Sequence, residues 1–204
     1  MPTDRPRYIA FEGIEGCGKS TQASRLARSI SAVLTRETGG TAIGARVREV
    51  LHDPANTNLS PIAEALLIAG DRAQHRAEVL APALAGGQHV VSDRSVYSSL
   101  AYQGYGRGLD LSMLRTVNDW ALDGQWPDLV ILLDMDHEVA MQRLSSRTLD
   151  RFEQETKEFF ARIRLGFRTM ADDERHRWVV IDATRSTDEI ELDVRRAVAR
   201  TLGI

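Results

Sequence analysis

The sequence predicts an α/β fold, a doubly wound five-stranded parallel sheet flanked by helices. Two observations support this prediction. Five short apolar segments recur along the 204 residues, and segments with helical periodicity separate them. The short segments are apolar almost throughout rather than at alternate positions, which is typical of parallel strands that are covered on both faces. Strands that alternate with helices in this way form a parallel sheet with helices on both sides.

The expected elements follow one another in regular alternation. The predicted strands are rich in β-branched or aromatic residues, and they cover residues 8–11, 32–34, 89–92, 129–133 and 178–181. The first predicted helix, over 20–33, has apolar residues at three- and four-residue spacing, which gives it one apolar face. The same spacing predicts helices over 63–80, 113–122, 139–144, 159–170 and 190–202. Two irregular stretches remain, a glycine-rich loop at 104–108 and a polar segment at 145–150.

Composition excludes several classes of protein. The net charge is −3, from 26 basic and 29 acidic residues, so bulk electrostatics gives no reason to expect nucleic acid or a membrane surface as a partner. The single cysteine, Cys17, excludes an internal disulfide and a multi-cysteine metal site. No run approaches the roughly 18 apolar residues of a membrane span, and no signal peptide is visible. We expect one cytoplasmic domain over 1–204, with packing roles for Trp120, Trp126 and Trp178.

A phosphate-binding motif follows the first predicted strand. Residues 13–20 read GIEGCGKS and fit the pattern G-x-x-x-x-G-K-[ST], in which glycines let successive backbone N–H groups point at phosphate oxygens. Lys19 reaches the outer phosphates, Ser20 provides a hydroxyl ligand for Mg²⁺, and the next helix directs its positive dipole end at the anion. The predicted nucleotide-binding loop comprises Gly13, Ile14, Glu15, Gly16, Cys17, Gly18, Lys19, Ser20 and Thr21.

This motif is shared by switch GTPases, ATPase motors and small-molecule kinases. A switch GTPase carries an Asn-Lys-x-Asp sequence that reads guanine. The only lysines here are Lys19 and Lys157, and Lys157 follows Thr156, so that sequence is absent. A motor normally needs a longer chain. The motif therefore favours a small kinase.

An acceptor site is predicted beyond the third strand. Asp93 and Arg94 follow that strand directly, where a carboxylate can hold Mg²⁺ through water and a guanidinium can bind phosphate with its planar fork. Further along, Tyr102 and Gln103 offer an aromatic edge and an amide to a base.

Several segments together resemble bacterial thymidylate kinases over nearly the whole chain. They are FEGIEGCGKST, TRETGGTAIG, LLIAGDRAQH, DRSVYSSLAYQGYGRG, DRFEQE and IDATRS. The resemblance implies a P-loop fold of the nucleoside monophosphate kinase type, with ATP and Mg²⁺ as cofactors. It also implies phosphorylation of dTMP to dTDP for dTTP synthesis, and a homodimer.

The resemblance further implies roles for individual residues of the acceptor site. Glu15 would face the deoxyribose 3′-hydroxyl, Arg94 would bind the dTMP phosphate, and Tyr102 would crowd the 2′ position and so disfavour ribonucleotides. Arg36 and Glu37 would lie near the acceptor phosphate. Arg72 would bond a thymine carbonyl, and the residues that line the rest of the nucleotide pocket would be Arg48, Ile68, Ser98, Ser99 and Gln103.

A lid is implied at about 143–153. Its arginines would surround the phosphoryl group in transfer, whose transition state gains mainly from positioning and positive charge. Some family members have a basic residue inside the phosphate loop, but this loop has none before Lys19, so the lid must supply that charge. Arg185, in the IDATRS segment, is expected on the ATP side. The expected catalytic residues are Lys19, Arg94, Arg143, Arg147 and Arg151.

Two departures from the family pattern leave the acceptor open. The usual proline after Arg36-Glu37 is Thr38, and the phenylalanine that stacks on thymine is Ile68, which loses a ring-on-ring interaction of about 1 kcal/mol. The alternatives are a kinase for a related deoxynucleotide such as dUMP, and a nucleotide-binding regulatory module without turnover.

Overall fold

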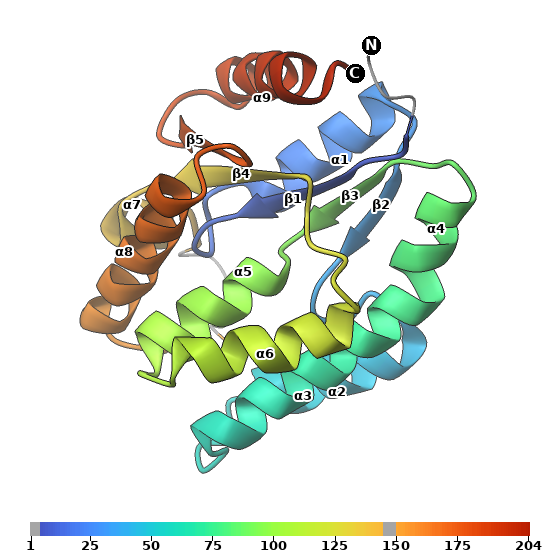
Figure 1. Cartoon of the computed structure of the whole chain (residues 1–204). Coiled ribbons are helices and arrows are strands. Elements are labelled where there is room, and N and C mark those ends of the chain that lie inside the picture. The colour runs from blue at the N-terminus through green and yellow to red at the C-terminus, as the bar shows by residue number, and fades with distance from the viewer. Residues whose placement is uncertain (1–4, 145–149) are drawn as a thin grey trace.

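The computed structural model describes residues 5–144 and 150–204, and within them the chain forms one parallel sheet (Figure 1). The strand order is β2-β3-β1-β4-β5, and every neighbouring pair is parallel. All five predicted strands are confirmed, and each runs on past its predicted end by at least one residue. Their bounds are β1 (Tyr8–Glu12), β2 (Val33–Arg36), β3 (Val90–Asp93), β4 (Leu129–Asp134) and β5 (Trp178–Asp182).

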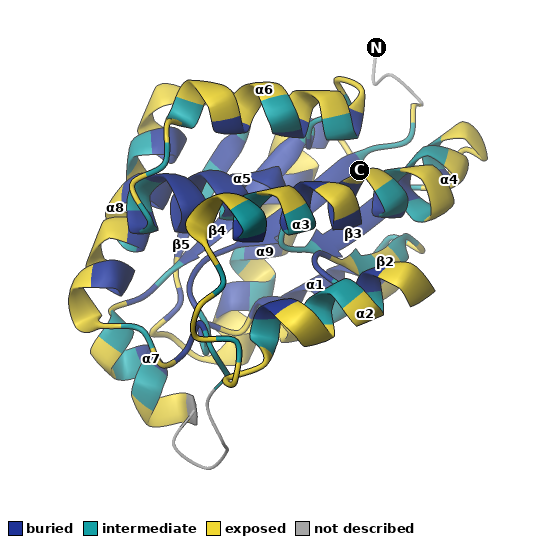
Figure 2. Cartoon of the chain, turned by 90° about the horizontal axis from the view of Figure 1, so that it is seen from below, coloured by how far each residue is buried: buried dark blue, intermediate teal, exposed yellow. Residues whose placement is uncertain are grey.

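Helices cover both faces of the sheet. Figure 1 shows α1 and α9 on one side and α3, α5 and α6 on the other, and Figure 2 shows the strands buried between these layers. The α-helices are α1 (Lys19–Ser29), α2 (Ala42–His52), α3 (Pro61–His75), α4 (Ala81–Ala85), α5 (Val96–Ser99), α6 (Leu111–Leu122), α7 (His137–Leu144), α8 (Lys157–Asp173) and α9 (Thr187–Leu202). Two π-helical segments continue α3 and α5 without a break, η1 (Arg76–Leu80) and η2 (Leu100–Gly106).

Local chemistry accounts for several helix ends. Ser60 begins α3 by accepting a hydrogen bond from the Ala63 N–H, and Pro61 occupies the first turn, where its missing N–H has no cost. The first helix ends at Ser29, four residues before the predicted end, because Ser31 adopts a left-handed conformation (φ 52°) that breaks the helix. Val33 therefore belongs to β2 and not to the helix.

The predicted glycine-rich loop at 104–108 is wrong over most of its length. Gly104 and Gly106 lie in η2, and chain outside regular structure starts only after them. Both glycines are needed for packing, because a Cβ at Gly104 would lie 2.4 Å from the Leu111 side chain and one at Gly106 would lie 2.6 Å from Phe159. These glycines let α6 and α8 approach η2 closely.

The central strands form the core, and β4 is buried over its first five residues. Trp126 and Trp178 pack edge-on against Tyr97, as predicted for packing residues. The prediction for Trp120 is wrong, since this side chain is 86% exposed on α6. Among the described residues, the structure contains no helix with the length and apolar character needed to cross a membrane.

Candidate active site

A cavity of about 270 Å³ opens at the carboxyl ends of β1, β2 and β3. Strand register brings the ends together, since Arg36 of β2 and Phe11 of β1 are both aligned with Asp93 of β3. Ligands bind at this edge in doubly wound folds. The predicted site residues that line the cavity are Glu15, Gly16, Lys19, Ser20, Arg36, Glu37, Arg48, Ile68, Arg72, Asp93, Arg94, Ser98, Ser99, Tyr102 and Gln103.

The phosphate loop wraps around its own lysine. Lys19 is 7% exposed, and its Nζ donates to the Ile14 carbonyl at 2.7 Å. Gly13 has φ 138° and Gly18 has φ 96°, both in the region that favours glycine. A Cβ on Gly13 would lie 2.6 Å from the Leu133 carbonyl oxygen. The loop therefore has the backbone curvature that a phosphate cradle requires, at the N-terminus of α1.

Cys17 lies inside this loop as a buried packing residue. Burial raises the pKa of its thiol above the ordinary value, although the nearby Lys19 charge works in the opposite direction. A nucleophilic cysteine needs a lowered pKa. The contribution of Cys17 to the site therefore comes from its backbone.

Two residues predicted to hold Mg²⁺ meet at the mouth of the loop. The Ser20 hydroxyl donates a hydrogen bond to the Asp93 carboxylate. Both groups are hard oxygen donors, and Mg²⁺ is typically bound by one or two such protein groups together with water and substrate phosphates. The described residues contain no cluster of three or more acidic, histidine or cysteine side chains suited to a metal. The Ser20–Asp93 pair fits a Mg²⁺ that is shared with a bound nucleotide.

Arg94 lies directly across from the phosphate loop and is held by several partners. Its Nη2 lies 2.6 Å from a Glu15 carboxylate oxygen and 3.1 Å from the Tyr102 hydroxyl, and its Nη1 donates to Ser98 at 3.0 Å. The Tyr102 hydroxyl in turn donates to Glu15 at 2.7 Å. Arg94 also has a left-handed backbone (φ 74°), a costly conformation for a non-glycine residue that persists only where the surrounding structure holds it.

Two further arginines face the same part of the cavity. Arg36 is exposed at the end of β2, and Arg48 projects from α2 and donates to the Thr38 carbonyl at 3.3 Å. Burial and the neighbouring charges of Arg36 and Arg94 lower the pKa of Arg48. Three guanidinium groups that repel one another across a cavity are stabilised by an anion placed between them.

A buried glutamate that the sequence analysis missed organises the residues around Arg94. Glu12, at the end of β1, is completely buried and accepts hydrogen bonds from the backbone N–H and hydroxyl groups of Ser95 and Ser98. Burial raises its pKa, against the opposing charge of Arg94 and the bonds from these serines. The available signal was its position directly before the phosphate loop, at the end of an apolar strand.

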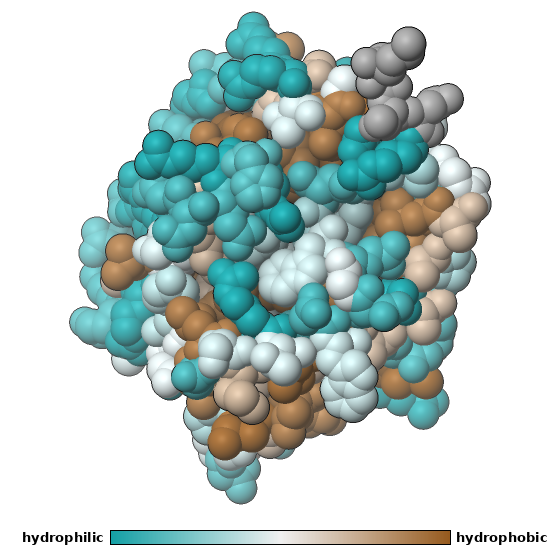
Figure 3. Space-filling model, viewed as in Figure 1, coloured by the Kyte–Doolittle hydropathy of each residue, from teal (hydrophilic) through white to brown (hydrophobic). Residues whose placement is uncertain are grey.

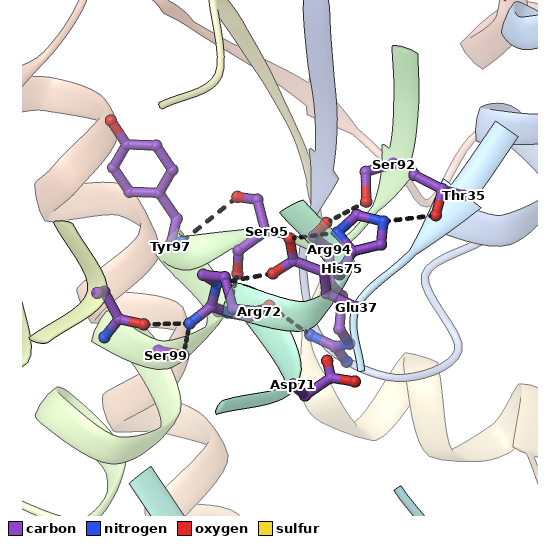
Figure 4. A network of polar contacts seen from close by, with 12 residues as sticks. Thr35, Glu37, Asp71, Arg72, His75, Ser92, Arg94, Ser95, Tyr97 and Ser99 are labelled. Carbon is purple, nitrogen blue, oxygen red and sulfur yellow. Dashed lines mark hydrogen bonds and ion pairs between the residues drawn. The ribbon is translucent and has the colours of Figure 1, made fainter. Parts of the chain in front are cut away.

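Arg72 is the centre of a buried polar network (Figure 4). Its Nε donates to Glu37 at 2.7 Å, one Nη to Ser99 and Asn118, and the other to the Ser95 carbonyl at 3.2 Å. Burial alone would raise the pKa of Glu37, but Arg72 and His75 hold it below its usual value. Glu37 therefore remains ionised and anchors Arg72, and it also lines the cavity. Of the five N–H donors of a guanidinium, these contacts leave one on Nη2.

Gln103 lies at the same end of the cavity and is 1% exposed. Its amide nitrogen donates to Glu64 at 2.8 Å, while its amide oxygen is buried without a hydrogen-bond partner. A buried acceptor without a partner costs about 1–3 kcal/mol. The amide oxygen is therefore available to a hydrogen-bond donor on a ligand.

Phe152 is a cavity residue to which the sequence analysis assigned no role, although it lies in the DRFEQE segment. It is 6% exposed and its ring meets those of Tyr102 and His52 edge-on, with centroids 6.0 and 5.3 Å away. Together with Ile68 and Leu51 it forms the apolar part of the cavity wall. The other lining residues without an assigned role are Thr38, Leu51, His52, Ser95, Asp150 and Glu153.

Three of the arginines predicted for the lid and the ATP side lie outside the cavity lining. Arg143 is exposed and its Nη2 lies 3.5 Å from the Thr184 carbonyl oxygen, and Arg185 forms an exposed ion pair with Asp193. Arg151 binds Glu64 at 2.6 Å. Arg147 lies outside the described residues. The structure thus brings the acceptor residues together, but Arg143, Arg151 and Arg185 do not line the cavity.

The fold and the site together define a class of protein. A phosphate loop that faces an arginine-lined cavity with a polar, buried far end is the arrangement of a P-loop kinase that acts on a small phosphorylated acceptor. The thymidylate kinase family model matches residues 11–194. The chain belongs to the thymidylate kinase family.

Individual relatives agree with this assignment along nearly the whole chain. A thymidylate kinase of Pelotomaculum thermopropionicum is 46% identical over 96% of this chain and 94% of its own length. One of Leifsonia xyli is 48% identical over 96% of both chains. A crystal structure of thymidylate kinase from Ehrlichia chaffeensis matches with a TM-score of 0.79 at 32% identity, and covers 95% of this chain and 98% of its own.

Proposed function

We propose that this chain carries out the reaction of its family, the transfer of the γ-phosphoryl group of ATP to dTMP, which yields dTDP. The main supporting observation is the pair of unsatisfied groups at the buried end of the cavity. Gln103 presents an acceptor without a partner, and Arg72 has one N–H donor left. Thymine carries an N3–H donor next to its O4 acceptor, which is the complementary pair. Cytosine has the reverse pair, an N3 acceptor beside an amino donor.

The acceptor phosphate takes the end of the cavity next to the phosphate loop. There Arg94, Arg36 and Arg48 converge, and a phosphate forms stronger, forked hydrogen bonds with guanidinium than a neutral ligand does. The phosphate of dTMP displaces Glu15 from Arg94. The freed carboxylate then accepts a hydrogen bond from the deoxyribose 3′-hydroxyl, and the Tyr102 ring limits space beside the 2′ carbon.

The donor side uses the phosphate loop. Backbone N–H groups and Lys19 hold the ATP phosphates, and Ser20 and Asp93 hold Mg²⁺. When bound, Mg²⁺ neutralises charge on the phosphoryl oxygens. A phosphate acceptor is already an anion, so the transfer needs alignment and positive charge rather than a strong base. We propose one domain over 1–204 whose lid, at about 143–153, carries Arg143 and Arg147 to the phosphoryl group, with Arg185 beside ATP.

A panel of acceptors tests this function. We expect a coupled ADP-release assay to give the highest kcat/KM for dTMP. Uracil presents the same hydrogen-bonding edge as thymine and lacks only a methyl group, so kcat/KM for dUMP should be lower than that for dTMP by roughly tenfold or more. The kcat/KM for dCMP should be far lower still. A higher kcat/KM for dUMP would reassign the acceptor. Tight ATP binding without transfer to any monophosphate would instead indicate a regulatory module. We propose a cytoplasmic location, where ATP is available.

We also propose a homodimer formed through α2, α3 and α6. These helices pack side by side, and each exposes two apolar residues at helical spacing, namely Ile43 and Val50, Ile62 and Leu66, and Met113 and Trp120. Figure 3 shows hydrophobic side chains gathered over α3, at the lower end of the view. Isologous dimers bury such a self-complementary patch.

The mass in solution tests the dimer. We expect light scattering to give about twice the 22.7 kDa of one chain. Trp120→Glu should shift the mass toward that of one chain, because it places a charge in the patch. Leu165→Glu, at an equally apolar exposed position on α8, should leave the mass unchanged. Equal effects of the two variants would argue against this interface.

A further inference from the structure

The orientation of the Gln103 amide determines what the cavity can recognise. With its oxygen toward the cavity, the amide accepts from a base N3–H, and with its NH₂ toward the cavity, it would donate to a base N3. The contact with Glu64 decides between these orientations. An ionised carboxylate accepts hydrogen bonds only, so it pairs with the NH₂ end of the amide, at 2.8 Å, and directs the oxygen elsewhere.

Glu64 is itself rigidly held. It is 1% exposed, it lies in the first turn of α3, and it does not line the cavity. One carboxylate oxygen accepts from Arg151 at 2.6 Å, and Arg107 contacts both oxygens at 3.3 Å. Two guanidinium groups and the positive end of the helix dipole stabilise the negative charge. Each carboxylate oxygen of Glu64 thus already accepts from an arginine, and toward Gln103 the side chain is an acceptor.

The arginines are also immobilised. Arg151 donates its Nε to the Leu51 carbonyl at 2.7 Å, and its guanidinium lies 4.5 Å from the centre of the Phe152 ring. The Arg107 guanidinium lies 4.7 Å from the centre of the Phe159 ring and pairs with Glu155. Both arginines are therefore anchored by groups other than Glu64.

We infer that Glu64 is a positioning residue that sets the Gln103 amide to accept from the base, and that it thereby selects bases with an N3–H over cytosine-type bases. The inference rests on the proposed acceptor site. The inference also assigns Arg151 a role different from that of a catalytic lid arginine, because in this structure Arg151 holds Glu64.

The variant Glu64→Gln tests the inference with little change in shape. The short Arg151 contact keeps an oxygen at the same place, so the new NH₂ group occupies the position that faces Gln103. Gln103 must then offer its own oxygen to residue 64 and turn its NH₂ toward the cavity. We measure kcat/KM for dTMP and the inhibition constant of 5-methyl-dCMP as a competitor, because this nucleotide has nearly the shape of dTMP and reverses the hydrogen-bonding groups.

In Glu64→Gln we expect the preference for dTMP over 5-methyl-dCMP to fall by about tenfold or more, the loss expected when a buried polar pair is mismatched. The change should appear in the KM for dTMP, and the KM for ATP should stay unchanged. Glu155→Gln is the matched control, since it removes a carboxylate from Arg107 without touching Gln103, and its preference should equal that of the wild type.

If Glu64 had a purely structural role, its replacement would weaken the binding of both nucleotides by the same factor and leave the preference for dTMP unchanged. That result would overturn the inference. If Glu64→Gln does not fold, Glu64→Asp makes the same comparison, because it keeps the charge for the arginines but withdraws the carboxylate from Gln103. An unchanged ratio there would also overturn it. If the wild-type chain does not phosphorylate dTMP, the proposed function fails, which is a separate outcome from an unchanged ratio in an active enzyme.

Discussion

Replacement of Lys19 by alanine is expected to lower kcat by on the order of 10²-fold or more, the equivalent of about 3 kcal/mol of transition-state stabilisation. Lys19 is the only basic side chain of the phosphate loop, and in this structure its Nζ is buried and donates to the Ile14 carbonyl. During transfer, charge develops on oxygens that a preorganised cation at this position contacts from the donor side. Steady-state kinetics with saturating ATP and dTMP measures the loss.

The other lysine provides the control for this experiment. Lys157 lies at the start of α8 in an exposed ion pair with Glu138, and exposed pairs of this kind contribute little. Lys157→Ala should therefore retain normal turnover and stability. A Lys19→Ala variant with nearly wild-type kcat would remove Lys19 from its catalytic role.

Arg94→Lys is expected to reduce kcat/KM for dTMP by about 10²-fold, with the KM for ATP little changed. Lysine keeps the positive charge but loses the planar fork, and with it one or more charge-assisted hydrogen bonds of about 1.5–3 kcal/mol each. Lysine and arginine have the same difficulty with a left-handed backbone, so the strain at this position is unchanged by the substitution. Initial rates over a matrix of ATP and dTMP concentrations separate the two substrates.

A surface arginine serves as the matched control for Arg94. Arg76 forms an ion pair with the exposed Asp123, away from the cavity, and Arg76→Lys should leave both kinetic constants unchanged. If Arg94→Lys impaired the use of ATP and of dTMP by equal factors, Arg94 would not be the residue that holds the acceptor phosphate.

The sheet and the phosphate loop were predictable because their signals are local. Each strand is a run of apolar residues, and the loop requires glycines, a lysine and a serine at fixed spacing directly after a strand. Asp93 and Arg94 could be placed for the same reason, since they lie at the carboxyl end of a strand, the edge at which ligands bind in this fold. Other acceptor residues, such as Glu15, Arg36 and Arg72, followed from the resemblance to a family.

Other features had no local signal. The glycines of η2 look like loop residues, and only the approach of Leu111 and Phe159 explains them. Trp120 looks like a core residue, yet it is exposed on a face that we assign to a second subunit. Glu64 lies 39 residues from Gln103 along the chain, so no motif connects the two.

The sequence by itself determined the fold class and the position of the phosphate loop, because hydrophobic period and glycine spacing act over a few neighbouring residues. Only the tertiary structure decided that Glu37 anchors Arg72, that Arg151 holds Glu64, and that the amide oxygen of Gln103 is buried without a hydrogen-bond partner. Those outcomes depend on which charged groups become buried together. Two such side chains would interact weakly in water. When they are buried, the hydrogen bond between them is stronger and leaving either one unpaired is costly, so their relative arrangement is fixed.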